Sequence, residues 1–328
     1  MEAPETAKTE ARFTRMPSLP TRPLGRSGLD VSIVGLGCNN FGRRVDLDQT
    51  RAVVDAALEE GVTFFDTADI YGQGLSEEYL GEVLQGRRDQ VVLATKFGMD
   101  MGDGRGPRGS RDYIMQAIDA SLKRLRTDVI DYYWYHRPDG VTPFRETLEA
   151  LHELVQAGKV RAIGASNFDA QQLEEAAAIV EEHGLTPFTA VQNEYNLLVR
   201  EAEDEVLPAS ERLGIGFVPF FPLASGLLTG KYRRGEPGPA NARLSARDEI
   251  ASPEQFELVE ALQRFADERG VPLTDVAVGA LLAREVVSSV IAGATKPEQV
   301  RSNAAAGRWT PTAEDLAALQ DLLAAHAL

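Results

Sequence analysis

Short apolar runs alternate with longer amphipathic stretches from residue 31 onward, and this alternation constrains the fold more than any other feature. The apolar runs lie at 31–38, 64–68, 91–97, 129–136, 160–167, 190–196, 214–223 and 288–294. Between them, segments such as 47–61, 76–86, 142–158 and 169–184 space their apolar residues as an amphipathic helix does and end at glycine. Repeated strand and helix units of this kind predict a parallel sheet.

Such a sheet can stay open and doubly wound or close into a barrel. The even repeat over 47–184 and a short hairpin predicted over 23–30 favour a (β/α)8 TIM barrel. Helical segments at 252–269, 274–284 and 312–325 exceed one helix per strand, and we expect these extra C-terminal helices to pack outside the barrel. We therefore predict an α/β fold with a flexible N-terminal tail over 1–20 and a single barrel domain over 21–328.

The chain's charge disfavours whole classes of partner. Fifty acidic and 34 basic residues give a net charge of −16, which repels nucleic acid and anionic membrane surfaces. The single cysteine cannot form an internal disulfide, and the four histidines have no metal-ligand spacing. No apolar stretch is long enough for a membrane span. We expect a cytoplasmic protein without a metal, and the sequence leaves open whether it forms a homo-oligomer.

Four residues with proton-transfer chemistry follow or end predicted strands. Asp66 lies in FFDTADIYG, Tyr71 follows five residues later, Lys96 closes VVLATK and His136 closes YYWYH. Active sites of α/β barrels gather at the C-terminal ends of the strands, so we expect these side chains to converge on one pocket.

Each of the four residue types suggests a role in reducing a carbonyl group. A free tyrosine has a pKa of about 10 and needs a neighbouring cation to act as an acid near neutrality. Lys96 would stabilise the phenolate of Tyr71, Asp66 would keep Lys96 charged, and His136 would hydrogen-bond the carbonyl oxygen. Any one of these residues alone would more often be a packing or surface residue. Asp69 is interpreted as structural.

Eight segments together resemble the aldo-keto reductase family over about residues 22–319. In order they are GLGCNNFG, FFDTADIYG, VVLATKFG, YHRPDG, IGASNF, VQNEYNLL, FFPLASGLLTGKY and IAGATKPEQVRSN. The resemblance implies an NADP-dependent carbonyl reductase or alcohol dehydrogenase that acts on small-molecule aldehydes, ketones or alcohols. The family's catalytic tetrad then corresponds to Asp66, Tyr71, Lys96 and His136.

The resemblance also implies which residues hold the cofactor. Ser166, Asn167 and Gln192 would bind the nicotinamide carboxamide, and Phe220 would stack on the ring, whereas Phe221 stands where a serine is common. Cys38, Asn39 and Asp66 are further expected cofactor contacts. Around the pyrophosphate we expect Pro222, Leu223, Ser225, Gly226 and Lys231, with Arg243 closing over the cofactor, and at the ribose phosphate Gly293, Thr295, Gln299 and Asn303.

The choice between the two nicotinamide cofactors is less constrained. In one branch of the family a lysine and an arginine stand where this chain has Gly293 and Gln299, so two direct phosphate partners are missing. Lys296 and Arg301 lie close enough in sequence to supply charge. We predict NADP as the cofactor and keep NAD as the alternative.

The same motifs also allow other functional interpretations. A non-catalytic or slow redox sensor resembling the potassium-channel beta subunits is the main alternative. GLGCNN lacks the third glycine of a Rossmann loop, and GASNF lacks the last glycine of a nucleophile elbow. The glycine-rich segment 98–109 is expected to be a substrate loop, and Phe41, Phe97, Trp134 and Arg137 are expected to wall the pocket.

Overall fold

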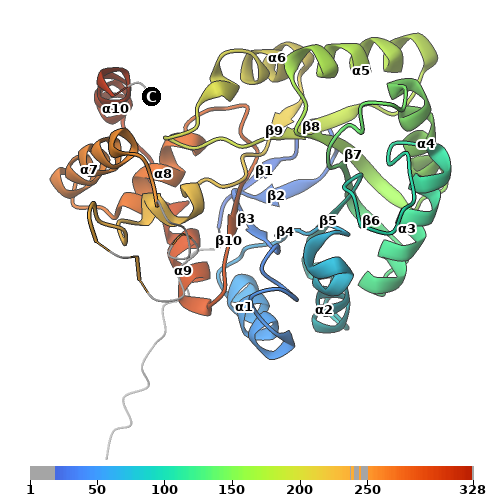
Figure 1. The fold of residues 1–328 in the computed structure, drawn as a ribbon, viewed down its shortest axis with the longest axis horizontal. Helices are drawn as coiled ribbons and strands as arrows, with labels where there is room; N and C mark the ends of the chain where they lie inside the picture. Colours follow the sequence, from blue (N-terminus) through green and yellow to red (C-terminus); the bar gives the residue numbers. More distant parts are fainter. Residues whose placement is uncertain (1–18, 237, 240–243, 245–249, 327–328) are drawn as a thin grey trace, which may run out of the picture.

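Eight parallel strands form one curled sheet in the computed structural model, which describes residues 19–236, 238–239, 244 and 250–326 (Figure 1). The strands are β3 (Val34–Gly37), β4 (Phe64–Asp66), β5 (Val92–Phe97), β6 (Ile130–Tyr135), β7 (Val160–Ser166), β8 (Phe188–Gln192), β9 (Gly216–Phe217) and β10 (Val290–Gly293). Their order in the sheet is β10-β3-β4-β5-β6-β7-β8-β9. Parallel bridges from Phe217 to Val287 and from Phe220 to Ile291 join the two edges. The predicted (β/α)8 barrel is therefore confirmed.

An antiparallel hairpin precedes the barrel. Its strands are β1 (Thr21–Pro23) and β2 (Asp30–Ser32), and the hairpin was predicted. Leu24 and Val31 belong to the apolar cluster inside the barrel, so the hairpin packs against that interior. One strand predicted over 31–38 is instead two, because residues 31 and 32 pair within the hairpin before β3 begins. Leu19, assigned to the tail, is already buried; residues 1–18 lie outside the described part.

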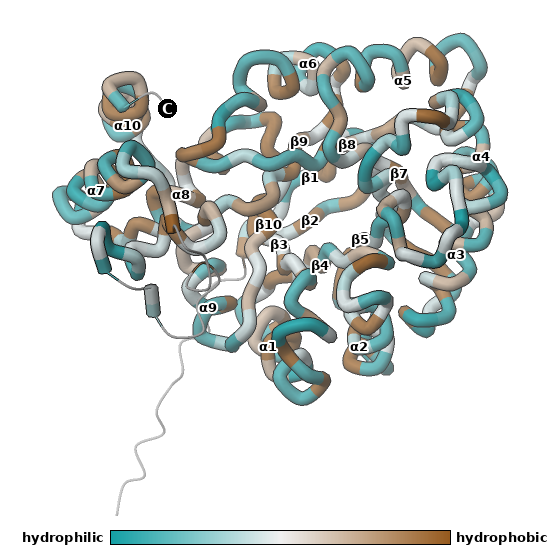
Figure 2. Tube along the Cα trace, in the orientation of Figure 1, coloured by the Kyte–Doolittle hydropathy of each residue, from teal (hydrophilic) through white to brown (hydrophobic). Residues whose placement is uncertain are grey.

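Helices follow the strands and surround the barrel. They are α1 (Leu47–Glu59), α2 (Leu75–Val83), α3 (Arg111–Leu125), α4 (Phe144–Gln156), α5 (Ala170–His183), α6 (Val206–Leu213), α8 (Leu273–Leu282) and α9 (Pro297–Ala306). Hydrophilic and hydrophobic residues alternate along the outer helices (Figure 2), as expected of helices with one face on a core. Helices α1 and α5 begin at aspartate capping boxes, Asp46 and Asp169.

Helices α7 (Pro253–Glu268) and α10 (Ala313–Ala325) lie beside the barrel with α8 (Figure 1). Leu262, Val276 and Leu319, one from each helix, belong to a separate apolar cluster. The prediction that the C-terminal helices pack outside the strands is confirmed for α7 and α10. Helix α8, which was counted as extra, connects β9 to β10 and so takes the place of the crossover helix.

The ninth strand is much shorter than the apolar run 214–223 predicted. Only Gly216 and Phe217 form ladder pairs, with β8. Proline has no backbone N–H to donate to a ladder, and Pro219 and Pro222 fall in this run. The chain nevertheless stays in the barrel wall through Phe220, which bridges Glu194 and Ile291, and crosses the C-terminal end of the barrel only beyond that residue.

Side chains alternate between the barrel interior and the helix layer along each strand, which sets the position of the functional residues. The interior cluster includes Phe64, Ala94, Tyr132, Ala162 and Ala190. Because alternate residues of a strand face the same side, the next inward positions toward the C-terminal ends are Asp66, Lys96, Trp134, Gly164 and Gln192. Above the apolar interior, at the C-terminal ends of the strands, lies a polar layer that contains Asp66, Lys96 and Gln192.

Among the described residues, no helix has the length and apolar character that crossing a membrane requires.

Candidate active site

Lys96 is the central buried charge of the polar layer. Its side chain is fully buried, and its ammonium donates to the Asp66 carboxylate and, over 3.0 Å, to the carbonyl oxygen of Thr67. The same Nζ lies 3.5 Å from the Tyr71 hydroxyl. Asp66 also accepts a hydrogen bond from Nε2 of Gln192, at 3.1 Å. The structure thus joins three of the four predicted catalytic side chains in one line from Asp66 through Lys96 to Tyr71.

The turn after β4 positions Tyr71 above Lys96. The Asp69 N–H donates to the Lys96 carbonyl, and the Tyr71 N–H donates to the Ala68 carbonyl, each over 3.1 Å. A short 3-10 helix (Tyr71–Gly74) follows, in which Gly72 and Gln73 both have a φ of 57°. Glycine adopts this left-handed conformation without strain, whereas Gln73 is held there by the turn. These bonds tie the tyrosine backbone to the strand that carries the lysine.

The protonation of Lys96 and Tyr71 follows from burial and from their mutual contact. Burial lowers the pKa of Lys96, but the Asp66 carboxylate and Tyr71 raise it by more, so the lysine remains charged. Burial raises the pKa of Tyr71, and Lys96 opposes this without reversing it. The sequence led us to expect Lys96 to bring this pKa down toward neutrality. The net direction is upward, so Tyr71 keeps its proton throughout the neutral range.

His136 faces Tyr71 across the pocket. The two rings meet edge to face, with 6.0 Å between their centroids. Burial, followed by the positive charges of Lys96 and Arg137, holds the pKa of His136 well below its ordinary value. The imidazole is therefore neutral near pH 7. A neutral imidazole can donate a hydrogen bond to a carbonyl oxygen, but it does not act as a charged imidazolium acid. Its Nδ1 is buried without a hydrogen-bond partner among the described residues.

Asp69, interpreted from the sequence as structural, occupies an unusual environment. It is buried, and burial followed by the nearby Glu77 carboxylate raises its pKa to about 7, against the pull of Arg124. Glu77 is itself buried and accepts hydrogen bonds from Thr95 at 2.5 Å and from Arg124 at 2.6 Å. Arg124 thus stabilises two buried carboxyl groups, those of Asp69 and Glu77. Asp69 does not cap a helix, because the residue before the 3-10 helix is Ile70.

A large cavity of about 1250 Å³ opens over these residues at the C-terminal ends of the strands. It is lined by Asp66, Tyr71 and His136, whereas Lys96 lies beneath its floor. The predicted cofactor residues that also line it are Asn39, Ser166, Asn167, Gln192, Phe220, Phe221, Pro222, Leu223, Ser225, Gly226, Lys231, Gly293, Thr295, Gln299 and Asn303. The residues identified from separate motifs therefore share one cavity.

Three polar residues at the ends of β7 and β8 adjoin the candidate catalytic group. The side-chain amide of Asn167 donates to the His136 carbonyl oxygen at 2.9 Å and to Oγ of Ser166 at 3.1 Å. Asn167 has a φ of 57°, the left-handed conformation that asparagine tolerates better than most residues. Together with Gln192, these amide and hydroxyl groups face the cavity within one layer.

The segment after β9 forms a second wall. Phe221, Ala224 and Ser225 have positive φ values of 53°, 45° and 56°, so the chain folds back on itself there. The Lys231 ammonium lies beside Gly226, where an added Cβ would come within 2.8 Å of Nζ. Burial, and then the positive charge of Arg44, lowers the pKa of Lys231. Two cations therefore approach each other on this side of the cavity.

The loop after β10 leads into helix α9 at the far wall. The side-chain carbonyl of Gln299 accepts hydrogen bonds from the Thr295 N–H at 2.7 Å and from its hydroxyl at 3.1 Å. Arg301 pairs with Glu59 of α1 at 3.2 Å. The structure therefore directs Arg301 toward α1 and not toward the ribose phosphate site suggested by its sequence position, and Lys296 is not among the residues that line the cavity.

Several predicted site residues lie elsewhere. Cys38 is fully buried, and its neighbours Gly37 and Asn39, not Cys38 itself, line the cavity. Arg243 lies outside the described residues. The expectation that Phe41, Phe97 and Trp134 wall the pocket is wrong, since all three are fully buried, whereas Arg137 does line it.

Phe97 and Trp134 do not wall the cavity because side chains alternate between the two faces of each strand and because neighbouring side chains cover them. Phe97 follows the inward-facing Lys96, so it points to the helix layer, where it stacks on Tyr135 at a centroid distance of 5.1 Å. Trp134 faces inward at the register position of Lys96, but it is fully buried and does not reach the cavity. It packs on Tyr132 and fills the space above Gly164, where an added Cβ would come within 2.6 Å of its ring.

Several cavity residues were not identified from the sequence. Arg43 and Arg44, in the loop after β3, and Met99, in the loop after β5, follow strand ends, so the barrel rule could have found them. Pro272 and Thr274, at the start of α8, also line the cavity. No local pattern marks these two residues, because only packing of α8 beside the barrel brings them there.

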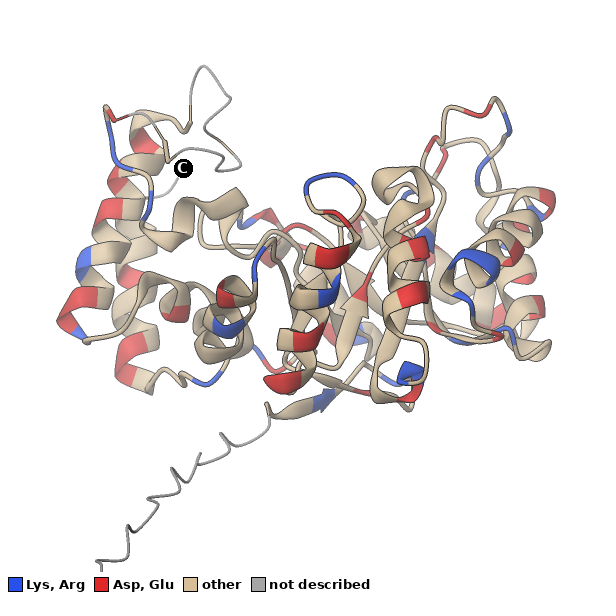
Figure 3. Cartoon of the chain, turned by 90° about the horizontal axis from the view of Figure 1, so that it is seen from below, with Lys and Arg blue, Asp and Glu red and all other residues tan. Residues whose placement is uncertain are grey.

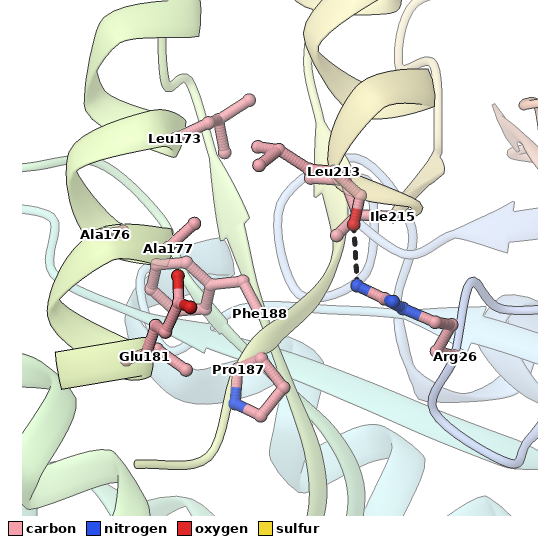
Figure 4. A pocket seen from close by; sticks show the side chains of 10 residues that line it. Arg26, Leu173, Ala176, Ala177, Glu181, Pro187, Phe188, Leu213 and Ile215 are labelled. Carbon is pink, nitrogen blue, oxygen red and sulfur yellow. Dashed lines mark hydrogen bonds between the residues drawn. The ribbon is translucent and has the colours of Figure 1, made fainter. Parts of the chain in front are cut away.

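A second, smaller cavity of about 170 Å³ lies between α5 and α6 beside the hairpin (Figure 4). Leu173, Ala176, Phe188 and Ile215 are among the mainly apolar residues that line it. The guanidinium of Arg26 donates to the carbonyl oxygen of Leu213 at 2.6 Å, as Figure 4 shows. Its lining lacks the paired acid and base of the large cavity, so we regard it as a packing feature.

Comparisons with known proteins show which proteins the chain is similar to. A model of the aldo/keto reductase family matches residues 33–324. An uncharacterized oxidoreductase of Bacillus subtilis is 39% identical over 313 residues, covering 91% of this chain and 94% of that protein. A probable voltage-gated potassium channel subunit beta of Oryza sativa is 37% identical over 294 residues, covering 85% and 88%. L-glyceraldehyde 3-phosphate reductase of Escherichia coli K12 is 34% identical over 297 residues, covering 86% of each chain.

Proposed function

The chain belongs to the aldo/keto reductase family, and from this premise we propose that it reduces aldehydes or ketones to alcohols with a nicotinamide dinucleotide, and runs the reverse oxidation. One observation carries the proposal. The Tyr71 hydroxyl lies 3.5 Å from a buried lysine ammonium that is itself paired with Asp66, at the floor of a cavity that His136 also lines. This is the arrangement that a proton donor to a carbonyl oxygen requires.

The lining of the cavity suits a dinucleotide. The volume of about 1250 Å³ exceeds the roughly 300–1,000 Å³ typical of a small-ligand pocket, so it leaves room for a long cofactor and a small substrate. Asn39 lines this cavity, and its Oδ1 is a buried acceptor without a partner among the described residues. Lys231 offers charge and Ser225 a backbone N–H for a pyrophosphate, whereas the Gly226 N–H already donates to the Leu223 carbonyl at 2.7 Å. Ser166, Asn167 and Gln192 would hold the nicotinamide amide.

The chain's own residues then divide the work of reduction. When bound, the reduced dinucleotide supplies the hydride that adds to the carbonyl carbon. Tyr71 transfers its phenolic proton to the carbonyl oxygen, so the product is a neutral alcohol. Lys96 stabilises the phenolate that remains, and Asp66 holds Lys96 charged. His136, as a neutral imidazole, orients the carbonyl oxygen toward Tyr71.

We propose NADP as the preferred cofactor, and NAD is the alternative. Thr295, Ser302 and Asn303 line the cavity where α9 borders it, and their hydroxyl and amide groups would face a ribose phosphate. Arg301 does not contribute, because it pairs with Glu59. We expect titration of cofactor fluorescence to give a lower Kd for NADPH than for NADH. Equal affinity for both would contradict the preference and leave the reductase proposal standing.

A second candidate function is a binding protein that senses the redox state of its dinucleotide with little turnover. It is favoured by the two plant relatives named as probable potassium channel subunits, which are 37% and 36% identical to this chain. Steady-state consumption of NADPH with a simple aromatic aldehyde separates the two. Many turnovers per protein molecule support the reductase, whereas tight binding without turnover supports the sensor.

A further inference from the structure

The charged residues that line the large cavity are mostly basic, in a chain that is mostly acidic. They are Arg43, Arg44, Arg137, Lys231 and Asp66, and Asp66 is already paired with Lys96. The chain as a whole has 50 acidic and 34 basic residues, and acidic residues are spread along the outer helices (Figure 3). A low-dielectric cleft of one sign concentrates ligands of the opposite sign. The cavity is therefore suited to anions.

The cations on one side of the cavity are accounted for by the dinucleotide phosphates. Lys231 lies in the segment after β9, close enough to Arg44 for the arginine's charge to lower its pKa. The candidate ribose phosphate site follows β10. Arg137 follows β6, which lies four places from β10 in either direction around the eight-strand order. It therefore projects from the wall opposite the ribose phosphate site, next to the imidazole that would bind the carbonyl group.

Arg137 has no ion pair with any residue that the structure describes, although acidic residues lie in its own loop and in the loop after β5. Asp139, two residues away, instead accepts hydrogen bonds from the backbone of Gly109 at 2.7 Å and of Thr142 at 2.8 Å. Asp100 and Asp103, in the loop after β5, pair with Arg108 at 2.6 and 2.8 Å.

The uncompensated charge of Arg137 acts on the reaction site itself. It contributes to lowering the pKa of His136, after burial and Lys96. A guanidinium close enough to disfavour a charged imidazole is close enough to attract an anion bound beside that imidazole. Its planar donors match the two oxygens of a carboxylate or phosphate.

We propose that Arg137 determines substrate specificity by binding an anionic group, a carboxylate or a phosphate, on the carbonyl compound that is reduced. This inference rests on the proposed function and narrows its substrate class to small anionic aldehydes and ketones. The carbonyl oxygen lies between Tyr71 and His136, and the anion lies toward the loop after β6. The dinucleotide phosphates bind to the cations on the β9 and β10 side of the cavity.

Two matched pairs of aldehydes test the proposal and distinguish the two anions. The phosphate pair is glycolaldehyde phosphate and glycolaldehyde, and the carboxylate pair is succinic semialdehyde and methyl 4-oxobutanoate. We expect the wild-type protein to favour the anionic member of at least one pair in kcat/KM, and the pair with the larger ratio identifies the anion. Arg137→Gln should reduce that ratio by roughly 10- to 100-fold, the range expected for one charge-assisted hydrogen bond, mainly through a higher KM for the anionic aldehyde.

Three controls give the result its meaning. The neutral member of each pair should keep its kcat/KM in Arg137→Gln, which excludes general damage. Arg137→Lys should retain part of the preference, because it keeps the charge. Arg145→Gln removes one exposed arginine from α4 that pairs with Glu149, and it should behave as the wild type does.

Each contrary outcome has a separate meaning. A wild-type ratio near one for both pairs, or a ratio that Arg137→Gln leaves unchanged, overturns the role of Arg137 while the reductase activity stands. If the wild type reduces none of the four aldehydes with either dinucleotide, the proposed function fails and the inference fails with it.

Discussion

Replacing Tyr71 with phenylalanine is expected to lower kcat for aldehyde reduction by roughly 10²–10⁴-fold, the usual contribution of a positioned general acid. The hydroxyl that contacts Lys96 at 3.5 Å is lost, while the ring and its packing remain. Because Tyr71 lines the end of the cavity that we propose for the nicotinamide, away from the proposed phosphate contacts, the Kd for NADPH should stay nearly unchanged. Initial rates and fluorescence titration of the same protein preparation measure the two quantities.

Tyr79→Phe is the matched control for that variant. Tyr79 lies on α2 and does not line the cavity, so removing its hydroxyl should change neither kcat nor the Kd. A Tyr71→Phe protein that reduces aldehydes at the wild-type rate would exclude Tyr71 as the proton donor. Loss of both dinucleotide binding and turnover would instead indicate that the Tyr71 hydroxyl also helps to hold the cofactor.

Replacing Lys96 with methionine should damage both catalysis and stability. Lys96 is fully buried and paired with Asp66, and removing one partner of a buried ion pair costs about 3–5 kcal/mol because the other charge is left uncompensated. Without the ammonium, the phenolate of Tyr71 also loses its stabilising charge. We expect a lower free energy of unfolding, measured in urea, together with a kcat at least as low as that of Tyr71→Phe.

The double variant Asp66→Asn with Lys96→Met separates the two effects. It removes both charges, and the asparagine oxygen can still accept from Gln192, so most of the lost stability should return. Activity should not return, because the phenolate still lacks its cation. A double variant that regains activity along with stability would show that Lys96 acts only as a structural residue.

The position of the candidate site could be predicted from the sequence because the alternation along strands is strict. Asp66, Lys96 and Gln192 end inward-facing rows, and in a barrel such rows meet at one end. The same rule would have assigned Phe97 to the helix layer, since it directly follows Lys96. Aromatic character alone does not mark a pocket wall, because the two-residue period of the strand determines which side the ring faces.

Other features depend on tertiary packing and have no local signal. The direction of the pKa shift of Tyr71 depends on burial, which outweighs the effect of Lys96. Thr274 reaches the cavity only because α8 packs beside the barrel. The sequence position of Arg301 suggests a phosphate contact, but α1 brings Glu59 within 3.2 Å of its guanidinium. These side chains are positioned by elements distant in sequence, and a motif cannot report such contacts.

The identity of the proton donor is the central claim, and the pH dependence of the two directions of reaction tests it most directly. Reduction needs protonated Tyr71, whose pKa lies above its ordinary value, so kcat/KM for the aldehyde should be flat from about pH 6 to pH 9. Oxidation of the alcohol needs the phenolate, so its kcat/KM should rise with pH over the same range. If His136 were the acid, reduction would require an imidazolium whose pKa is well below its ordinary value. A rate of reduction that falls about tenfold per pH unit through neutrality would therefore contradict the assignment to Tyr71.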